Sequence, residues 1–331
     1  MSEPLFVEIV RGLSVESVHL VDAVVVNNMG EVLTAYGDPT LAVYPRSAIK
    51  PLQALPFVLS KAFESLQHHD QVIALACASH HAEAQHLEVL LDWQQKSLLQ
   101  ESDLICGPQP PEDEQALHDL VRHRQLPTRL HNNCSGKHTA FLMACRAHQW
   151  PSQGYQHWDH PLQVEIRRLL TQFSGVQHDQ LPWGIDGCGI PTYSLELRAL
   201  ARMMSAFLRP DHYGANLSWG LQRIREACAR QPWMIGGRTS LCSQVGLLSQ
   251  GSILAKIGAE GVYSAVLFDE GTAISLKARD GGSRACEAAL AALLRKHSTL
   301  KPEILSEIET FACPPILNWA GETVGHTKVR L

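Results

Sequence analysis

The sequence predicts an α+β fold in which both ends of the chain build one antiparallel sheet and the middle forms a helical lobe. Three patterns carry this prediction: β-branched runs with turn signals near the start, amphipathic helical spacing through the middle, and further β-branched runs near the end. We expect one domain with a sheet lobe at about 1–46 and 240–331 and a mainly helical lobe at about 47–239. Two lobes leave a cleft between them, which is a common position for an active site.

Each predicted element follows from a local pattern. Near the start, Val18–Asn27 is rich in β-branched residues, and an Asn-Met-Gly turn returns the chain into a second strand at Val32–Tyr36. In the middle, Pro161 opens a helix whose apolar stripe ends at Gly175, and another helix is expected at Tyr193–Leu208. Near the end, strands followed by a helix are expected at 252–257, 262–268, 273–278 and 284–298.

Composition excludes several classes of protein. The 331 residues are 45% hydrophobic and 18% charged with a net charge of −5, which is typical of a globular chain. The sequence has no run or stripe of basic residues of the kind that binds nucleic acid. Its apolar runs are too short to span a bilayer. The nine cysteines are not spaced like those of a disulfide-bonded scaffold, and the first residues do not resemble a secretory signal. Both observations favour free thiols in a reducing compartment. We therefore expect a cytoplasmic protein with no nucleic-acid or membrane partner.

The most informative short motif contains a serine and a lysine. Ser47 and Lys50 stand three residues apart at the start of a predicted helix, so both project from one face. A lysine with a lowered pKa can serve as the base that activates a serine nucleophile. The adjacent Arg46 suits a substrate carboxylate, because its planar fork matches that group, although a surface ion pair is equally compatible with the sequence.

A second serine lies at the end of a buried run. Ser79 follows the apolar stretch 72–76 and is read either as a second nucleophile or proton relay, or as the cap of a helix starting near Ala82. His80 and His81 follow it, and histidines in such a position more often support a site than catalyse. Later, Lys256 ends an apolar strand; it is either a buried, low-pKa amine facing the cleft or an ordinary edge-strand lysine.

Two further segments contain cysteines with possible metal chemistry. Cys134 precedes a predicted helix, where the positive end of the helix dipole should depress its pKa, and glycines pin Cys188 in a tight turn. The two thiolates can share a zinc ion with His138 or Lys137 as third ligand and water as fourth. From chemistry alone a neutral histidine is the better choice, because an amine must lose a proton before it binds a metal. Buried inert cysteines are the commoner alternative.

Taken together, these segments resemble one family, the thermolabile L-asparaginase II family of serine–lysine, zinc-containing asparaginases. The matching landmarks run in the family's order along nearly the whole chain: VEIVRG, GDP, RSAIKP, ASH, HNNCSGKH, IDGCGIPTY and AKIGAEGVY. The two cysteine-containing landmarks are the long and specific ones. The resemblance implies a serine β-lactamase- and glutaminase-like fold, which agrees with the α+β organisation read from the residues. His81 departs from the family's pattern and is expected to narrow one wall of the pocket.

The resemblance also implies roles for individual residues. It makes Ser47 the nucleophile with Lys50 as partner and Ser79 with Lys256 a second pair, and Lys50 is expected to be neutral because Lys256 crowds it. It places one zinc ion per chain on Cys134, Lys137 and Cys188, with the choice between Lys137 and His138 left open. The residues expected to contact substrate are Arg46, His80, Asn133, His138, Asp186 and Glu260.

The implied activity is hydrolysis of L-asparagine to L-aspartate and ammonia by a homodimer. Two alternatives stand beside it. One is a related acyl-transfer enzyme, such as a glutaminase, another small-amide amidohydrolase or a hydrolase acting on β-lactams. The other is a zinc- or amino-acid-binding protein of the same fold that lacks catalysis.

Overall fold

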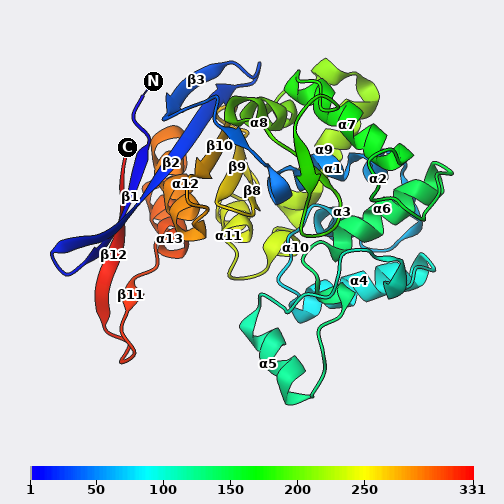
Figure 1. Ribbon diagram of the computed structural model, residues 1–331, viewed down its shortest axis with the longest axis horizontal. Helices are drawn as coiled ribbons and strands as arrows, with labels where there is room; N and C mark the ends of the chain where they lie inside the picture. Colours follow the sequence, from blue (N-terminus) through cyan, green and yellow to red (C-terminus); the bar gives the residue numbers. More distant parts are fainter. Residues whose placement is uncertain (1) are drawn as a thin grey trace.

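Both ends of the chain meet in one large antiparallel sheet, as the sequence predicts. The computed structural model describes residues 2–331. Figure 1 shows the first strands and the last strands side by side, with most helices of the middle segment gathered away from them and α8 lying against the sheet. The strands of this sheet are β1 Leu5–Arg11, β2 Ser14–Asn27, β3 Val32–Tyr36, β8 Ile253–Gly258, β9 Val262–Leu267, β10 Thr272–Ala278, β11 Ile316–Leu317 and β12 Thr323–Arg330.

The long strand β2 organises the sheet. The strand order is β11-β12-β1-β2-β10-β9-β8, and β3 also pairs with β2. The first half of β2 pairs with β1, and its second half pairs with β10. Residues 21–26 of β2 form an unbroken buried run. Such a run requires cover on both faces, and helices α8, Leu197–Met204, and α12, Ser283–His297, both pack against β2. The predicted α+β class is therefore confirmed.

The remaining elements form the helical part and two small strand pairs. β4 Ala42–Val43 pairs with β7 Leu195–Glu196, and β5 Trp183–Ile185 pairs with β6 Pro191–Tyr193. The helices are α1 Lys50–Gln53, α2 Leu55–Leu59, α3 His69–Ala76, α4 Ala84–Lys96, α5 Glu114–Arg122, α6 Ser135–Ala147, α7 Pro161–Ser174, α9 Ala215–Arg230, α10 Trp233–Gly236, α11 Leu241–Leu248 and α13 Pro302–Ala312. None within residues 2–331 is both long and apolar enough to cross a membrane.

Two sequence predictions are corrected by these boundaries. The helix expected from Tyr193 begins only at Leu197, because Tyr193 itself belongs to strand β6. Ser79 does not cap the next helix, since α4 begins at Ala84 and Glu83 occupies the cap position. The helix at 161–174 is confirmed, with Gly175 in the left-handed conformation that ends it.

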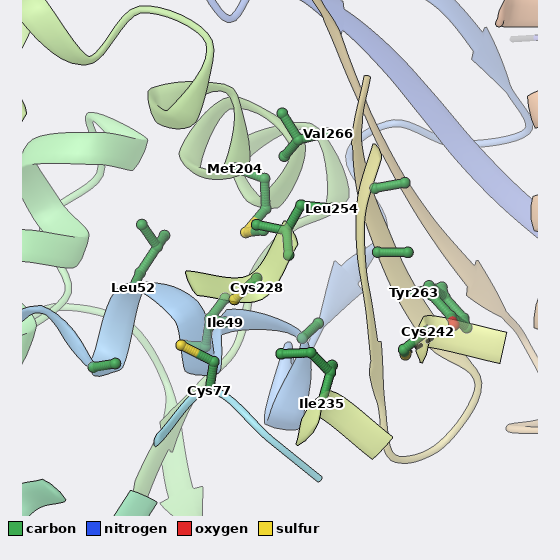
Figure 2. Packing of buried hydrophobic residues seen from close by; sticks show 14 of the residues in the cluster. Ile49, Leu52, Cys77, Met204, Cys228, Ile235, Cys242, Leu254, Tyr263 and Val266 are labelled. Atoms are coloured by element: carbon green, nitrogen blue, oxygen red, sulfur yellow. Dashed lines mark hydrogen bonds between the residues drawn. The ribbon is translucent and has the colours of Figure 1, made fainter. Parts of the chain in front are cut away.

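The core positions one face of β8 against the helical part. Figure 2 shows Leu254 of β8 near Met204 and Ile49, whereas Cys242 and Tyr263 face each other on the other side of the strand. Side chains alternate along a strand, so Lys256 lies on the same face as Leu254. That face is covered by the segment around Ile49, and Lys256 is only 1% exposed. The sheet thus directs a lysine into the interior, toward the helical elements.

Candidate active site

A cavity of about 350 Å³ lies where the loops of the helical part approach the end of β8. It is lined by residues from four loops and by the residue that follows β8: Arg46, Ser47, Gly107, Pro108, Gln109, Asn132, Asn133, Cys134, Asp186, Gly187, Cys188 and Ala259. These stretches are far apart in the sequence. The fold therefore brings together the serine motif, both cysteine motifs and the end of the lysine strand.

Ser47 stands on a constrained piece of backbone at the cavity wall. The preceding Arg46 has a positive φ of 50°, a left-handed conformation that is uncommon for a residue with a side chain. The chain then forms the 3₁₀ turn Arg46–Ile49. Gly258 of β8 allows this turn to come close, because a Cβ atom at Gly258 would lie 2.4 Å from the Pro45 carbonyl oxygen. The tight approach fixes Ser47 against the end of β8.

Arg46 reaches across the cavity wall to Asp186. The Arg46 Nε–H donates to Asp186 Oδ1, and the Gly187 N–H donates to the same oxygen at 2.8 Å. Burial opposes ionisation of Asp186, but the charges of Lys137 and Arg46 hold its pKa below the usual value. The carboxylate is thus ionised, and it orients the guanidinium at the cavity.

The buried lysines meet at Ser79. Lys50 Nζ lies 2.9 Å from Ser79 Oγ, and Lys256 Nζ lies 2.8 Å from the same atom. Lys50 also donates to the carbonyl oxygens of Ala78 at 2.7 Å and Asn133 at 3.3 Å. Within residues 2–331 no side-chain hydrogen bond joins Lys50 to Ser47. Ser47 lines the cavity, whereas the Lys50 side chain is buried and its amine lies at Ser79.

Lys256 loses its proton more easily than an ordinary lysine. Burial lowers the pKa of Lys256 to about 8, and the nearby charge of Lys50 lowers it in the same direction. Lys50 has three acceptors, one for each N–H of an ammonium group, whereas Lys256 has only Ser79 Oγ and the Ile257 carbonyl at 3.0 Å. A neutral Lys256 can accept the Ser79 proton while Lys50 donates to the Ser79 oxygen.

The two predicted thiol ligands lie together beside a third donor. Lys137 Nζ is 3.1 Å from Cys188 Sγ, and a hydrogen bond from the Cys134 thiol lowers the pKa of Cys188 to about 6. The sequence predicts a lowered pKa for Cys134, and this prediction is wrong. The hydrogen bond to Cys188 and burial raise the pKa of Cys134. Burial opposes the charge on Lys137, but the charges of the two cysteines outweigh it and raise its pKa. Cys188 is the thiolate of the pair.

His138 and His80 lie behind the cavity rather than in its lining. His138 is fully buried, and its Nδ1 is 2.7 Å from the Tyr155 hydroxyl. Burial lowers the pKa of His138 to about 3. His80 Nδ1 accepts from the Ala82 N–H at 3.2 Å, and its Nε2 donates to Ser135 Oγ at 2.8 Å, so both nitrogens are occupied. The structure places neither histidine where it can touch a molecule in the cavity.

Of the remaining predicted contacts, Asn133 lines the cavity and Glu260 does not. Glu260 is exposed in the turn after β8, and its carboxylate lies against Gly281. Glu260 also has a positive φ of 62° in this turn.

Sequence reasoning missed the loop that precedes α5. Gln109 and Asn132 line the cavity, and Glu112 contacts Asn133 at 3.0 Å. The proline-rich string at 106–112 marked only a loop.

The donors for a metal ion are two sulfurs and one amine. Within residues 2–331, no group of three or more His, Cys, Asp or Glu side chains is arranged to hold a metal ion. A site at Cys134 and Cys188 therefore needs Lys137 as its third donor. Lys137 Nζ contacts a thiolate, whereas His138 is held by Tyr155, so the geometry favours Lys137. Two soft sulfurs and one nitrogen beside an open cavity fit zinc.

Comparison with known proteins adds family information. Residues 7–329 match the family model described as L-asparaginase II. A search of curated protein sequences gives no match.

Three solved structures are similar to the chain at low identity. One is described as Mglu, with 12% identity and a TM-score of 0.46 over 85% of this chain and 68% of that chain. A beta-lactamase from Mycobacterium bovis has 16% identity and a TM-score of 0.41 over 84% of this chain and 95% of its own. A putative beta-lactamase from Bacteroides dorei has 14% identity and a TM-score of 0.42 over 83% of this chain and 93% of its own.

Proposed function

The chain belongs to the L-asparaginase II family, and we propose that it hydrolyses L-asparagine to L-aspartate and ammonia through a serine nucleophile. The family match supports an asparaginase-type amidohydrolase. The observation that carries the finer proposal is the convergence of two buried lysines on Ser79, next to a cavity whose wall holds Ser47 and Arg46. A polar cavity of this size, with an arginine at its wall, suits a small amino acid.

Ser47 is the nucleophile in this proposal because it lines the cavity. Its Oγ attacks the carbon of the side-chain amide, and its proton passes to the base formed by Ser79 and neutral Lys256. The C–N bond then breaks, and the nitrogen leaves as ammonia after it takes up that proton. A water molecule hydrolyses the aspartyl ester, which restores Ser47 and releases aspartate.

Arg46 would hold the α-carboxylate of the substrate. Its Nε is committed to Asp186, but the two terminal nitrogens of the guanidinium remain for a ligand carboxylate. The role of Asp186 is then to fix the direction of Arg46. This geometry leaves the side-chain amide of the substrate near Ser47, the next residue along the wall.

One zinc ion per chain is part of the proposal. Cys134, Cys188 and Lys137 would hold it, with the fourth position open to the cavity. When bound, zinc would supply a fixed positive charge that attracts and orients a polar or anionic group of the substrate. Lys137 would have to lose a proton to join the site, so zinc binding should be weaker at low pH.

Two further parts complete the proposal. Homodimer formation is implied by the family resemblance. A cytoplasmic location is favoured by nine cysteines that are all free thiols.

The decisive experiment is an ammonia-release assay on a panel of amides. Asparagine should be turned over much faster than glutamine, and a penicillin should not be opened. Faster turnover of glutamine would make the protein a glutaminase-type amidohydrolase. Binding of aspartate or asparagine without release of ammonia would instead support a non-catalytic binding protein of the same family.

A further inference from the structure

Two carboxylates with different partners lie at the cavity: Asp186 lines it, and Glu112 contacts two of its lining residues, Gln109 and Asn133. Asp186 is already paired with protein cations, since its Oδ1 accepts from Arg46 and from the Gly187 N–H, and the charges of Lys137 and Arg46 favour its ionised form. Glu112, in contrast, contacts only neutral amides and one histidine. An amino-acid substrate carries a carboxylate and an ammonium group, and a buried or half-buried ammonium needs a carboxylate partner.

The Glu112 carboxylate is held against the cavity lining. Its Oε1 accepts from Asn133 Nδ2 at 3.0 Å and from Gln109 Nε2 at 3.3 Å, and both of these residues line the cavity. Its Oε2 lies 3.4 Å from His81 Nε2, which among residues 2–331 is its one ion-pair partner. The carboxylate is therefore held beside two residues of the cavity lining. Within residues 2–331 no lysine or arginine forms an ion pair with it, although its charge also acts on Lys256.

The backbone around Glu112 is fixed on both sides. Pro111 before it is buried, and the Asp113 N–H after it donates to the His81 carbonyl at 3.1 Å. Asp113 also caps α5, because its Oδ1 accepts from the Ala116 N–H at 2.7 Å. The side chain of Glu112 is 45% exposed, so a small molecule in the cavity can reach it. His81, which was expected to narrow the pocket, serves instead to hold this acid.

We propose that Glu112 binds the α-ammonium group of the substrate and thereby makes the site select α-amino amides over the same amides without the amino group. Arg46 then binds the α-carboxylate of the zwitterionic substrate, and Glu112 binds its α-ammonium group. The side-chain amide is left to react with Ser47. This inference rests on the proposed amide hydrolysis only for its substrate, because recognition of the ammonium group can be measured without turnover.

The test compares asparagine with succinamate, which has the same amide and carboxylate but no amino group. Glu112→Gln keeps an oxygen acceptor for Asn133 and removes the charge. In this variant kcat/KM for asparagine should fall by about 10- to 100-fold, the range expected for a hydrogen bond to a charged group, and succinamate should change less than about threefold. Glu114→Gln, the same change two residues away on the exposed start of α5, should leave both substrates unchanged. Glu112→Asp should recover part of the loss.

Calorimetric binding of aspartate and succinate separates this inference from the proposed function. The wild-type protein should bind aspartate more tightly than succinate, and Glu112→Gln should abolish that preference. Suppose that the wild-type protein turns over asparagine normally. If Glu112→Gln then loses kcat/KM equally on asparagine and succinamate, or on neither, the ammonium assignment is overturned and the amidohydrolase proposal stays intact. A wild-type protein that releases no ammonia but prefers aspartate in a Glu112-dependent manner would refute the hydrolysis alone.

Discussion

The two serines of the site occupy opposite environments. Ser79 is 8% exposed and lies within hydrogen-bond distance of two lysine amines. Ser47 lines the cavity, and in the part of the chain described no side-chain hydrogen bond joins it to Lys50 or Lys256. The two serines therefore have separate roles: Ser47 is accessible to substrate, and Ser79 is in contact with a base. Proton transfer would then have to link the cavity wall to the interior.

Replacing each serine in turn should give the largest effects. Ser47→Ala should lower kcat by about 10⁴-fold or more, as loss of a nucleophile does, without changing thermal stability. Ser79→Ala should lower kcat by about 10²- to 10⁴-fold, the usual contribution of a proton-transfer group. Steady-state ammonia assays on both purified variants, with thermal unfolding curves, measure the difference.

Covalent trapping distinguishes the two serines directly. An asparagine analogue with a diazoketone in place of its amide should leave an adduct that peptide mass spectrometry maps to Ser47. An adduct on Ser79, with turnover retained in Ser47→Ala, would reverse the assignment and make the buried serine the nucleophile.

The sequence predicts the two regions unequally well. The sequence leaves Lys256 either as a buried amine facing the cleft or as an ordinary edge-strand lysine, and the structure shows that it is buried. The hydrogen-bond partner of Lys50 could not be predicted. Spacing predicts that Ser47 shares its face, but it does not show how far the lysine side chain extends. Lys137 and His138 are adjacent on α6 and point in different directions, so only packing shows which one reaches Cys188.

The sequence could not predict the role proposed for Glu112, for another reason. Glu112 lies in a proline-rich loop without periodicity, and its position depends on Asn133 and His81, which are distant in the chain. Local patterns predict helices and strands, and therefore the sheet and most of its neighbours. Contacts between loops follow from the tertiary fold alone.

Removing one thiol should affect the cavity wall but not the buried lysines. Cys134→Ala should reduce zinc from one ion per chain to nearly none and weaken substrate binding, because two donors cannot retain the ion. Cys145→Ala, a buried cysteine on the same helix, should keep its zinc. Elemental analysis of both variants provides the measurement, and equal metal content in Cys134→Ala and wild type would refute the site.

The smallest predicted effect concerns the acid–base state of the interior. Lys256 has a pKa of about 8, below the ordinary value for lysine, and only its neutral form accepts a proton. From pH 6.5 to 8 the neutral fraction grows about 16-fold, so kcat should rise with pH, reach half its maximum near pH 8 and level off above about pH 9. A profile of kcat at saturating asparagine tests this, because kcat reports groups in the enzyme–substrate complex.

A charge-preserving change assigns that rise to Lys256. Lys256→Arg keeps a cation beside Ser79 but cannot be deprotonated in this range, so the rise near pH 8 should disappear along with most of the activity. Lys277→Arg alters a lysine of the same sheet whose amine binds the carbonyl oxygen of Ala278 at 2.7 Å, and it should keep the rise. A flat wild-type profile, or an unchanged step in Lys256→Arg, would mean that the base is Lys50 or lies outside the Ser79 cluster. If the base lies outside the cluster, the interior holds two permanent cations, and Ser79 is a structural hydroxyl between them rather than the link between Ser47 and a base.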